Sequence, residues 1–342
     1  MITEKIFGQT SKGDTVKEYT LTNGTVEVDI INYGGAVRCI KLKDKNGVTR
    51  DVVLGWDDVE GYENGSGFYG AFVGRFGNRI INSEFTLNGK TYHLTPNNGR
   101  NHLHGTFSNR VLDSHVEGDS LVMTLVSPPE EEGYPGTLNV TVRYTLNDKN
   151  GLEIDYVATT DEDTVINLTN HSYFNLNGQN GRGVHDLRLQ IIADRFTPVT
   201  EEVIPTGEIL PVDGTPFDLR EGIRVGDGLE STHPQITMHK TYDHNFIFPE
   251  GEGNRLFATV YSEDTGIKLE AFTTEPAVQL YVKNVKDVPI AEEGKKNPRQ
   301  SALCLETQHY PASPNFDHFP STVLKKGDTY HHFTEYRFSV EK

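Results

Sequence analysis

Residues 167–176, NLTNHSYFNL, gather amides, hydroxyls and aromatic rings around a single histidine. A solvated loop has no need of leucine and phenylalanine here, and a buried strand tolerates three asparagines only if each is hydrogen-bonded. The pattern is typical of the wall of a half-buried pocket, in which amides hold His171 beside an aromatic ring. A histidine whose pKa lies near neutrality can act as a general acid. Proton transfer by His171 is therefore one interpretation, and a structural histidine is the other.

A carboxylate in a comparable setting lies in residues 303–311, LCLETQHYP. If this segment is a strand, Glu306 points away from the face of Leu303 and Leu305 and shares its own face with Gln308. Apolar neighbours raise the pKa of a carboxyl group, which suits a base that must later return its proton. The motif alone also fits a charged residue on an edge strand.

Two further polar clusters are GRFGNRI at residues 74–80 and NHLHG at residues 101–105. An arginine held by close packing presents a fixed fork of donors to hydroxyls or carboxylates, although a surface turn with paired arginines has the same composition. On a strand, His102 and His104 point the same way and could bind a metal, as in cupin-like sandwiches. The carboxylate and third histidine of such a site are not found at the required spacing. A neutral hydrogen-bonding histidine and a structural histidine are the other interpretations.

Several common catalytic motifs are absent from the sequence: GxxxxGK[ST], HExxH, GxSxG and a strand-linked GxGxxG. Nucleotide, zinc-peptidase and serine-hydrolase chemistry therefore lack their usual residues. Two short polar runs remain, YDHN at 242–245 and EPAVQ at 275–279. Each is too short to indicate a function by itself.

Taken together, six motifs make a more specific pattern. GRFGNRI, NHLHG, NLTNHSYFNL, YDHN, TTEPAVQLY and LETQHYPASPN follow one another between residues 74 and 315. In this order they resemble the galactose mutarotase, or aldose 1-epimerase, family over nearly the whole chain. The resemblance implies an all-β fold, a large antiparallel β-sandwich with an open sugar-binding cleft, in a single domain over residues 1–342. It also implies that no metal and no organic cofactor is needed.

Carried over residue by residue, the resemblance implies that His171 is the general acid and Glu306 the general base. The positions that match substrate-binding residues are Asn78, Arg79, His104, Ser172, Tyr173, Asp243 and Gln279. Arg75 has no firm counterpart. The chain departs from the family pattern at Ala312, where many relatives carry Asp, and at Tyr242, where Phe is common. Neither position matches a catalytic group, so the departures concern substrate preference.

The implied reaction interconverts the α and β anomers of free aldohexoses, with D-galactose and D-glucose as the expected substrates. One alternative is a glycoside hydrolase or lyase on a related sandwich, with Glu306 and Asp243 as the two carboxylates that hydrolysis normally requires. Such an enzyme has no evident use for the His171 motif. A second alternative is a sugar-binding module without turnover, which would not need both His171 and Glu306. Mutarotation and glycoside hydrolysis assays separate the three.

The elements that must position these residues are predicted to be strands. Asn-Gly and Asp-Gly dipeptides, which supply the positive φ angles of tight hairpins, recur along the chain. Alternating apolar residues over 138–146 and 152–156, separated by a polar turn, predict a hairpin with one buried face. No run of 12 residues has a convincing helical stripe, and no linker divides the chain. Many short strands without helices indicate a sandwich or barrel.

Composition limits the possible partners. The 342 residues carry 32 Lys and Arg against 49 Asp and Glu, a net charge of −17, which disfavours nucleic acids and anionic membranes. We expect a small monosaccharide as the partner, whereas the preferred aldose and the oligomeric state are not readable from sequence. Cys39 and Cys304 are too few for a disulfide framework and indicate reduced structural thiols. With no apolar leader or membrane-spanning run, a cytoplasmic location is expected.

Overall fold

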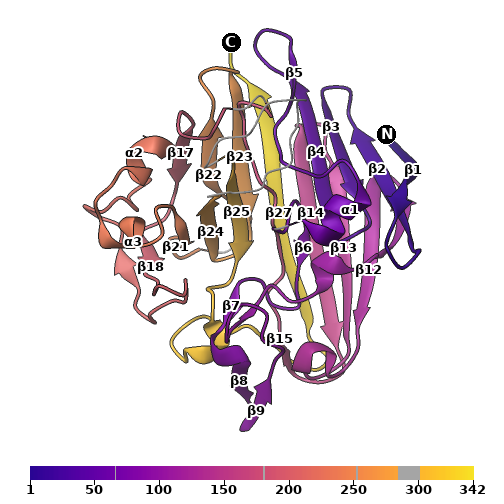
Figure 1. The fold of residues 1–342 in the computed structure, drawn as a ribbon, viewed down its shortest axis with the longest axis vertical. Coiled ribbons are helices and arrows are strands. Elements are labelled where there is room, and N and C mark those ends of the chain that lie inside the picture. The colour runs from indigo at the N-terminus through magenta and orange to yellow at the C-terminus, as the bar shows by residue number, and fades with distance from the viewer. Residues whose placement is uncertain (66, 180–181, 252, 284–300) are drawn as a thin grey trace.

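The computed structural model describes residues 1–65, 67–179, 182–251, 253–283 and 301–342 (Figure 1). Within these ranges strands dominate, and the α-helices have at most six residues: α1 (Val59–Asn64), α2 (Val225–Leu229) and α3 (Pro234–Thr237). No helix in the described ranges is long and apolar enough to cross a membrane.

The largest sheet has nine antiparallel strands in the order β11-β12-β13-β14-β27-β23-β22-β17-β20. Their bounds are β11 (Asp113–Glu117), β12 (Ser120–Ser127), β13 (Leu138–Leu146), β14 (Gly151–Thr160), β27 (Thr329–Val340), β23 (Ile267–Thr273), β22 (Arg255–Tyr261), β17 (Arg188–Ile191) and β20 (Ile223–Arg224). The hairpin predicted from alternating residues is β13–β14, in which Leu146 pairs with Leu152. Alternate residues of β13 are buried, as the period of two requires.

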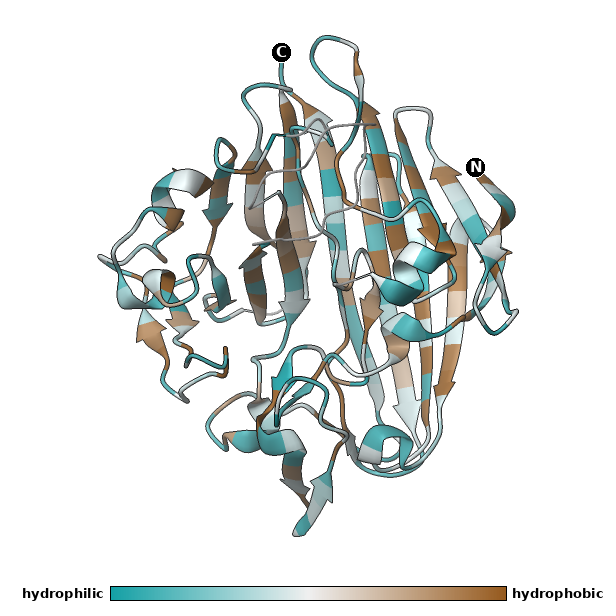
Figure 2. Cartoon of the chain, in the orientation of Figure 1, coloured by the Kyte–Doolittle hydropathy of each residue, from teal (hydrophilic) through white to brown (hydrophobic). Residues whose placement is uncertain are grey.

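Two five-stranded sheets lie against the large one. The first contains β1 (Ile2–Gln9), β2 (Thr15–Thr22), β3 (Val26–Ile31), β4 (Ala36–Lys43) and β5 (Thr49–Asp51). The second, in the order β19-β18-β21-β24-β25, contains β19 (Leu210–Pro211), β18 (Arg195–Thr197), β21 (Asp243–Ile247), β24 (Ala277–Val282) and β25 (Leu303–Gln308). A continuous apolar core joins all three sheets, for example through Val28, Tyr144 and Leu280. Figure 2 shows the corresponding apolar bands along the strands. The prediction of an all-β sandwich is confirmed, whereas the single domain over residues 1–342 stays a prediction.

Four two-stranded ladders complete the described strands. They pair β6 (Phe72–Val73) with β16 (Thr169–Asn170), β7 (Arg79–Ile80) with β10 (His102–Leu103), β8 (Glu84–Leu87) with β9 (Lys90–His93), and β15 (Thr164–Val165) with β26 (Val323–Leu324). Asn88 and Gly89 connect β8 to β9 with φ angles of 53° and 77°, the positive values of the predicted tight turn. The first two ladders bring the GRFGNRI, NHLHG and NLTNHSYFNL motifs together.

Register places three predicted site residues on one face of the β21-β24-β25 sheet. Gln279 on β24 pairs with Glu306 on β25 and with Asn245 on β21. Because directly paired residues share a face, and Asp243 lies two residues from Asn245, the side chains of Asp243, Gln279 and Glu306 are on the same side. The intervening residues Phe246, Leu280 and Leu305 are buried in the core on the other side. The three polar side chains therefore lie on one face of a sheet whose other face is packed in the core.

Candidate active site

The backbone around His171 is held by hydrogen bonds to the segment that precedes β6. The amide of His171 donates to the carbonyl of Ala71 at 2.9 Å, and the carbonyl of His171 accepts from Gly70 at 3.0 Å. Asn170 adds a side-chain bond, from Nδ2 to the carbonyl of Gly70 at 2.8 Å. The side-chain amide of Asn170 and the backbone bonds of His171 therefore hold the chain at the histidine.

Aromatic rings surround the buried imidazole of His171. Tyr173 stacks on it with ring centroids 4.8 Å apart and an interplanar angle of 22°. Phe68 is also nearly parallel to it, at 5.8 Å and 28°, while His104 meets it edge-on at 5.3 Å. The sequence pattern did not single out Phe68, which lies in a loop without periodicity. These contacts leave the imidazole little rotational freedom.

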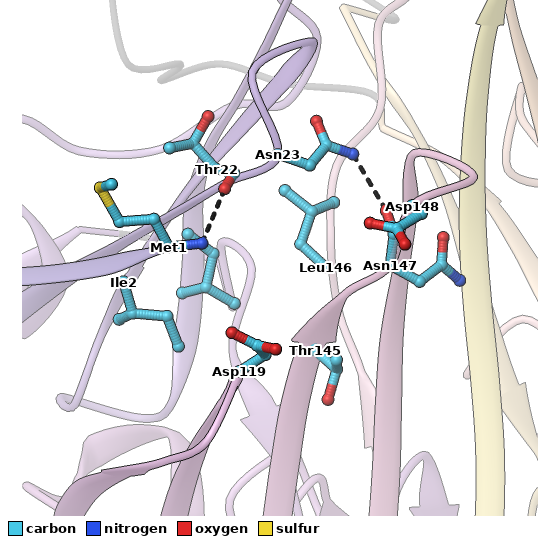
Figure 3. Close-up of a pocket in the computed structure, with 10 residues that line it drawn as sticks. Met1, Ile2, Thr22, Asn23, Asp119, Thr145, Leu146, Asn147 and Asp148 are labelled. Atoms are coloured by element: carbon cyan, nitrogen blue, oxygen red, sulfur yellow. Dashed lines mark hydrogen bonds between the residues drawn. The ribbon is translucent and has the colours of Figure 1, made fainter.

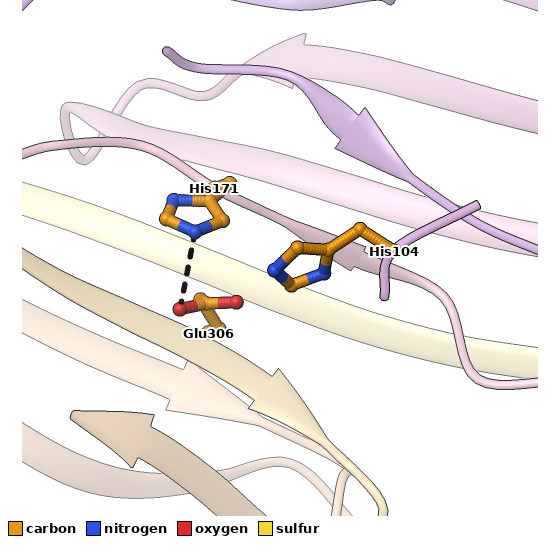
Figure 4. A group of neighbouring side chains, drawn as sticks. All are labelled: His104, His171 and Glu306. Atoms are coloured by element: carbon orange, nitrogen blue, oxygen red, sulfur yellow. Dashed lines mark ion pairs between the residues drawn. The ribbon is translucent and has the colours of Figure 1, made fainter. Parts of the chain in front are cut away.

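Glu306 extends from β25 toward the imidazole of His171. The distance from His171 Nε2 to Glu306 Oε1 is 3.5 Å, and both side chains are at most 5% exposed (Figure 4). Among the residues that the structure describes, neither His171 Nδ1 nor Glu306 Oε2 has a hydrogen-bond partner. Unpartnered buried polar atoms are costly unless a ligand or water meets them. These two atoms therefore retain hydrogen-bonding capacity that the described residues do not use.

Burial shifts the two pKa values in opposite directions. Desolvation, aided by the positive charge of Lys283, lowers the pKa of His171 to about 3. Desolvation and the negative charge of Asp243 raise the pKa of Glu306 well above its usual range, against the opposing charge of Arg79. The expectation of a near-neutral pKa for His171 is thus wrong for the free protein, because the imidazole is removed from water. The arrangement favours one shared proton with no net charge on the pair.

Asp243 and Gln279 form a second polar group on the same face of the β21-β24-β25 sheet. Gln279 Nε2 donates to Asp243 Oδ1 at 2.7 Å, and its Oε1 has no partner within the described ranges. Burial raises the pKa of Asp243, while Arg79 and the Gln279 bond oppose the rise. A carboxylate and an amide held side by side offer acceptors and donors to neighbouring hydroxyls.

The GRFGNRI and NHLHG motifs meet through the β7–β10 ladder. The amide of Asn78 donates to Nδ1 of His104 at 3.0 Å, so a neutral His104 carries its proton on Nε2. Burial lowers the pKa of His104 well below its usual value, which keeps it neutral. Arg79 Nε donates to Asn98 Oδ1 at 3.1 Å. The sequence pattern identified Asn98 only as a turn residue and did not predict that it orients an arginine.

His102 and His104 do not face the same side, as a strand would have required. Strand β10 ends at Leu103, and His104 has a φ angle of 62°, so the alternation of side chains stops there. His102 instead places Nδ1 2.7 Å from the carbonyl of Thr95 and packs its ring against Tyr134. The interpretation of these two residues as a metal pair is therefore wrong.

Two residues near the motifs have bonds that tie them to the scaffold. Ser172 Oγ donates to Asn170 Oδ1 at 2.5 Å, so this hydroxyl closes the turn around His171. Arg75 is buried, and its guanidinium donates to the carbonyl of Pro135 at 2.7 Å and to Ser127 Oγ at 2.6 Å. Its exclusion from the predicted site agrees with this structural role.

The two departures from the family pattern also have backbone partners. The amide of Ala312, whose φ angle is 58°, donates to the carbonyl of Arg79 at 2.8 Å. The hydroxyl of Tyr242 is directed to the carbonyl of Pro216, 2.7 Å away, and the ring is fully buried. The additional hydroxyl of Tyr242 thus donates a hydrogen bond to the backbone of another segment.

Tyr242→Phe is expected to lower the free energy of unfolding by about 1 kcal/mol, because the carbonyl of Pro216 loses its donor. The ring and its packing are retained, so KM and kcat should stay as in the wild type. Urea unfolding followed by tryptophan fluorescence measures the change, and Tyr92→Phe at a half-buried position controls for removal of a hydroxyl. A raised KM with unchanged stability would instead place Tyr242 in substrate recognition.

Two groups of described side chains have the composition and spacing to hold a metal ion. They are His104, His171 and Glu306, and Glu275, His309 and His332; within each group the ligand atoms lie within 4.8 Å of one another. The first group is the candidate active site. The second uses different residues and lies outside the predicted site.

A separate hollow near the N-terminus does not include the predicted residues. It has a volume of about 320 Å³ and is bordered by Met1, Asp119 and Asn147 among others (Figure 3). The amino group of Met1 donates to the carbonyl of Thr22 at 3.0 Å, and Asn23 Nδ2 donates to the carbonyl of Asn147 at 2.9 Å.

Comparison with known proteins identifies the family. The aldose 1-epimerase family model matches residues 17–337. A galactose mutarotase from Bos taurus is 42% identical over 349 residues, covering 99% of each chain, and an aldose 1-epimerase from Escherichia coli K12 is 34% identical, covering 96% of this chain and 97% of that one. A solved galactose 1-epimerase from Lactobacillus acidophilus superposes with a TM-score of 0.87 at 27% identity, covering 100% of this chain and 99% of that chain. The chain therefore belongs to the aldose 1-epimerase family.

Proposed function

We propose that this protein is an aldose 1-epimerase, an isomerase that interconverts the α and β anomers of free aldohexoses. The observation that carries the proposal is the buried contact of 3.5 Å between His171 Nε2 and Glu306 Oε1, a proton donor and a proton acceptor at one site. Relatives named galactose mutarotase, among them one from Homo sapiens that is 39% identical over 344 residues, support galactose as a substrate. We include glucose because it differs from galactose only at the C4 hydroxyl.

Throughout the reaction, His171 and Glu306 together carry one exchangeable proton. Glu306 takes the proton of the anomeric hydroxyl while His171 gives a proton to the ring oxygen, so the C1–O5 bond breaks and an aldehyde forms. The C1–C2 bond then rotates by half a turn. Ring closure reverses both transfers and yields the other anomer. Because burial favours the uncharged pair, the low-dielectric site stabilises the state that follows ring opening, with the proton on Glu306 and a neutral imidazole.

The remaining predicted residues would hold the sugar between acid and base. Arg79 and the Nε2 proton of His104 are donors, Asp243 is an acceptor, and Gln279 retains an open acceptor in Oε1. Sugar hydroxyls donate and accept at once, so they match such a mixture. Fixed orientation of the anomeric carbon converts proton transfer into a unimolecular step. We include Asn78, Ser172 and Tyr173 as residues that position His104 and His171.

Polarimetry on fresh α-D-galactose, α-D-glucose and α-D-xylose tests the function. A catalysed approach to the equilibrium rotation is expected for galactose, without any added metal or cofactor. Release of reducing sugar from an aryl galactoside would favour the hydrolase alternative, which has the Asp243 and Glu306 carboxylates. Galactose binding without faster mutarotation would favour the binding module and overturn the proposal.

The pH dependence of kcat/KM should reflect a pair that works with one proton. On acidification a second proton must add to His171, whose pKa burial lowers to about 3, so the acid limb should lie well below the usual histidine value of about 6.5. On alkalinisation the last proton leaves Glu306, whose pKa is raised. We expect kcat/KM, measured by polarimetry, to follow a broad bell-shaped profile against pH. An acid limb centred near pH 6.5 would contradict this prediction, because it would show a histidine that titrates at its ordinary pKa.

We also propose a cytoplasmic location with a monosaccharide as the only partner needed for catalysis. Support comes from Cys39 and Cys304, two buried free thiols of the kind that reducing compartments preserve. Fractionation of cells followed by detection of the protein tests the location, and recovery in a secreted fraction would contradict it.

A further inference from the structure

Glu275 is the centre of a second group of titratable side chains, which the proposed reaction does not use. It lies in the turn between β23 and β24, and its side chain is 1% exposed. Its Oε2 is 2.8 Å from Nδ1 of His309, and its Oε1 is 3.1 Å from Nδ1 of His332. The hydroxyl of Tyr330 also donates to Oε1, at 3.3 Å. Two imidazoles therefore converge on one buried carboxylate.

An open pocket gives this group access to solvent. The pocket has a volume of about 270 Å³, and its lining includes His309, His332, Tyr330 and the exposed Asp328. The side chains of His309 and His332 are 17% and 19% exposed, so both are reachable while Glu275 remains covered. An ion and its water ligands could enter from this side without passing through the sugar site.

We propose that Glu275, His309 and His332 form a binding site for a divalent transition metal ion, with Zn²⁺ as the reference ion. Two imidazole nitrogens and a carboxylate are ligands that Zn²⁺ and its neighbours in the first transition row prefer. Ligand atoms about 2.0 Å from a tetrahedral ion lie about 3.3 Å from one another. His309 Nδ1 is 2.8 Å from one oxygen of Glu275 and His332 Nδ1 is 3.1 Å from the other, and the three ligand atoms of the group lie within 4.8 Å of one another. Small side-chain rotations would bring them to that edge length around one ion. Water from the pocket would complete the coordination, and Asp328 would balance the remaining positive charge.

The metal would join three parts of the fold. Glu275 belongs to the β23–β24 turn, His309 follows β25, and His332 lies on β27. The amide of His309 also donates to Asn167 Oδ1 at 3.0 Å, at the start of the segment that carries His171. Because a metal bound only by the folded chain stabilises that fold, the site would brace the scaffold behind the sugar-binding residues.

Cobalt supplies a spectroscopic probe for the site. Full-length protein treated with a chelator and then dialysed is titrated with Co²⁺ while visible d–d absorption is recorded, and Zn²⁺ is then added as competitor. We expect one Co²⁺ per chain, displaced by Zn²⁺, and a Tm that rises with either ion. His332→Asn should weaken binding by at least about 100-fold, since loss of a ligand exceeds the 10–100-fold effect of an outer-sphere change. His331→Asn, an exposed neighbour paired with Asp155, should bind as the wild type does.

A further variant separates this site from the candidate active site. His171→Gln removes a ligand from the His104–His171–Glu306 group and should leave the cobalt signal unchanged, as should saturating galactose. Loss of the signal in His171→Gln with retention in His332→Asn would overturn the proposal. Absence of stoichiometric binding to the wild type would also overturn it, whatever the variants do. If His332→Asn does not fold, Glu275→Gln serves as the ligand variant, and retained binding there would count against the site. Catalytic activity is not a readout in this design, so failure of the proposed function would leave the result intact.

Discussion

Glu306→Gln should lower kcat for galactose mutarotation by at least about 100-fold, the low end of the contribution of a positioned base. The amide has nearly the same size as the carboxyl group and can still hydrogen-bond to the sugar, but it cannot accept the anomeric proton. KM should therefore change much less than kcat. Polarimetric initial rates over a range of galactose concentrations give both constants.

Glu270→Gln is the matched control for this prediction. Glu270 is a half-exposed carboxylate on β23 that pairs with Lys268 at 3.3 Å, and its loss should leave kcat unchanged. A Glu306→Gln protein that turns over like the wild type would remove Glu306 from the mechanism. A similar loss in both variants would indicate damage to the fold, which circular dichroism and Tm would reveal.

His171→Gln should also lower kcat by at least about 100-fold, because an amide cannot deliver a proton to the ring oxygen. A glutamine can place its Nε2–H groups near the position of the imidazole Nε2, so part of the binding energy should remain. The variant also removes the ring that stacks on Tyr173 at 4.8 Å. Since the predicted defect is in proton transfer, kcat should fall much more than galactose affinity measured by calorimetry.

The double variant of Glu306 and His171 distinguishes joint action from independent roles. If the two residues share one proton, the double variant should be about as slow as the slower single variant, as is usual for groups that act as a unit. His115→Gln, at an exposed position on β11, controls for the loss of a histidine. Multiplicative losses in kcat would contradict the shared-proton mechanism.

The fold class could be predicted from local patterns. Alternating apolar residues give strands β13 and β14, and a dipeptide such as Asn88-Gly89 gives a tight turn, because each pattern depends on backbone geometry over a few residues. The His171 and Glu306 motifs were also readable, since polar groups inside apolar runs must have partners or a function. The resemblance to a family added proposed substrate-binding residues that no local pattern could assign, such as Asp243 and Gln279.

The order of the strands and the contacts across them were decided by the tertiary structure. It brings His171 to 3.5 Å from Glu306 across 135 positions of sequence, and it removes both from water, which lowers one pKa and raises the other. It also separates His102 from His104 through a single positive φ angle and places Phe68 beside the imidazole. Sequence by itself determined which short segments are strands and which residue types can exchange protons, because those properties are local. Only the folded chain decided which of these residues meet and how strongly they are desolvated, because proximity and burial depend on packing between distant segments.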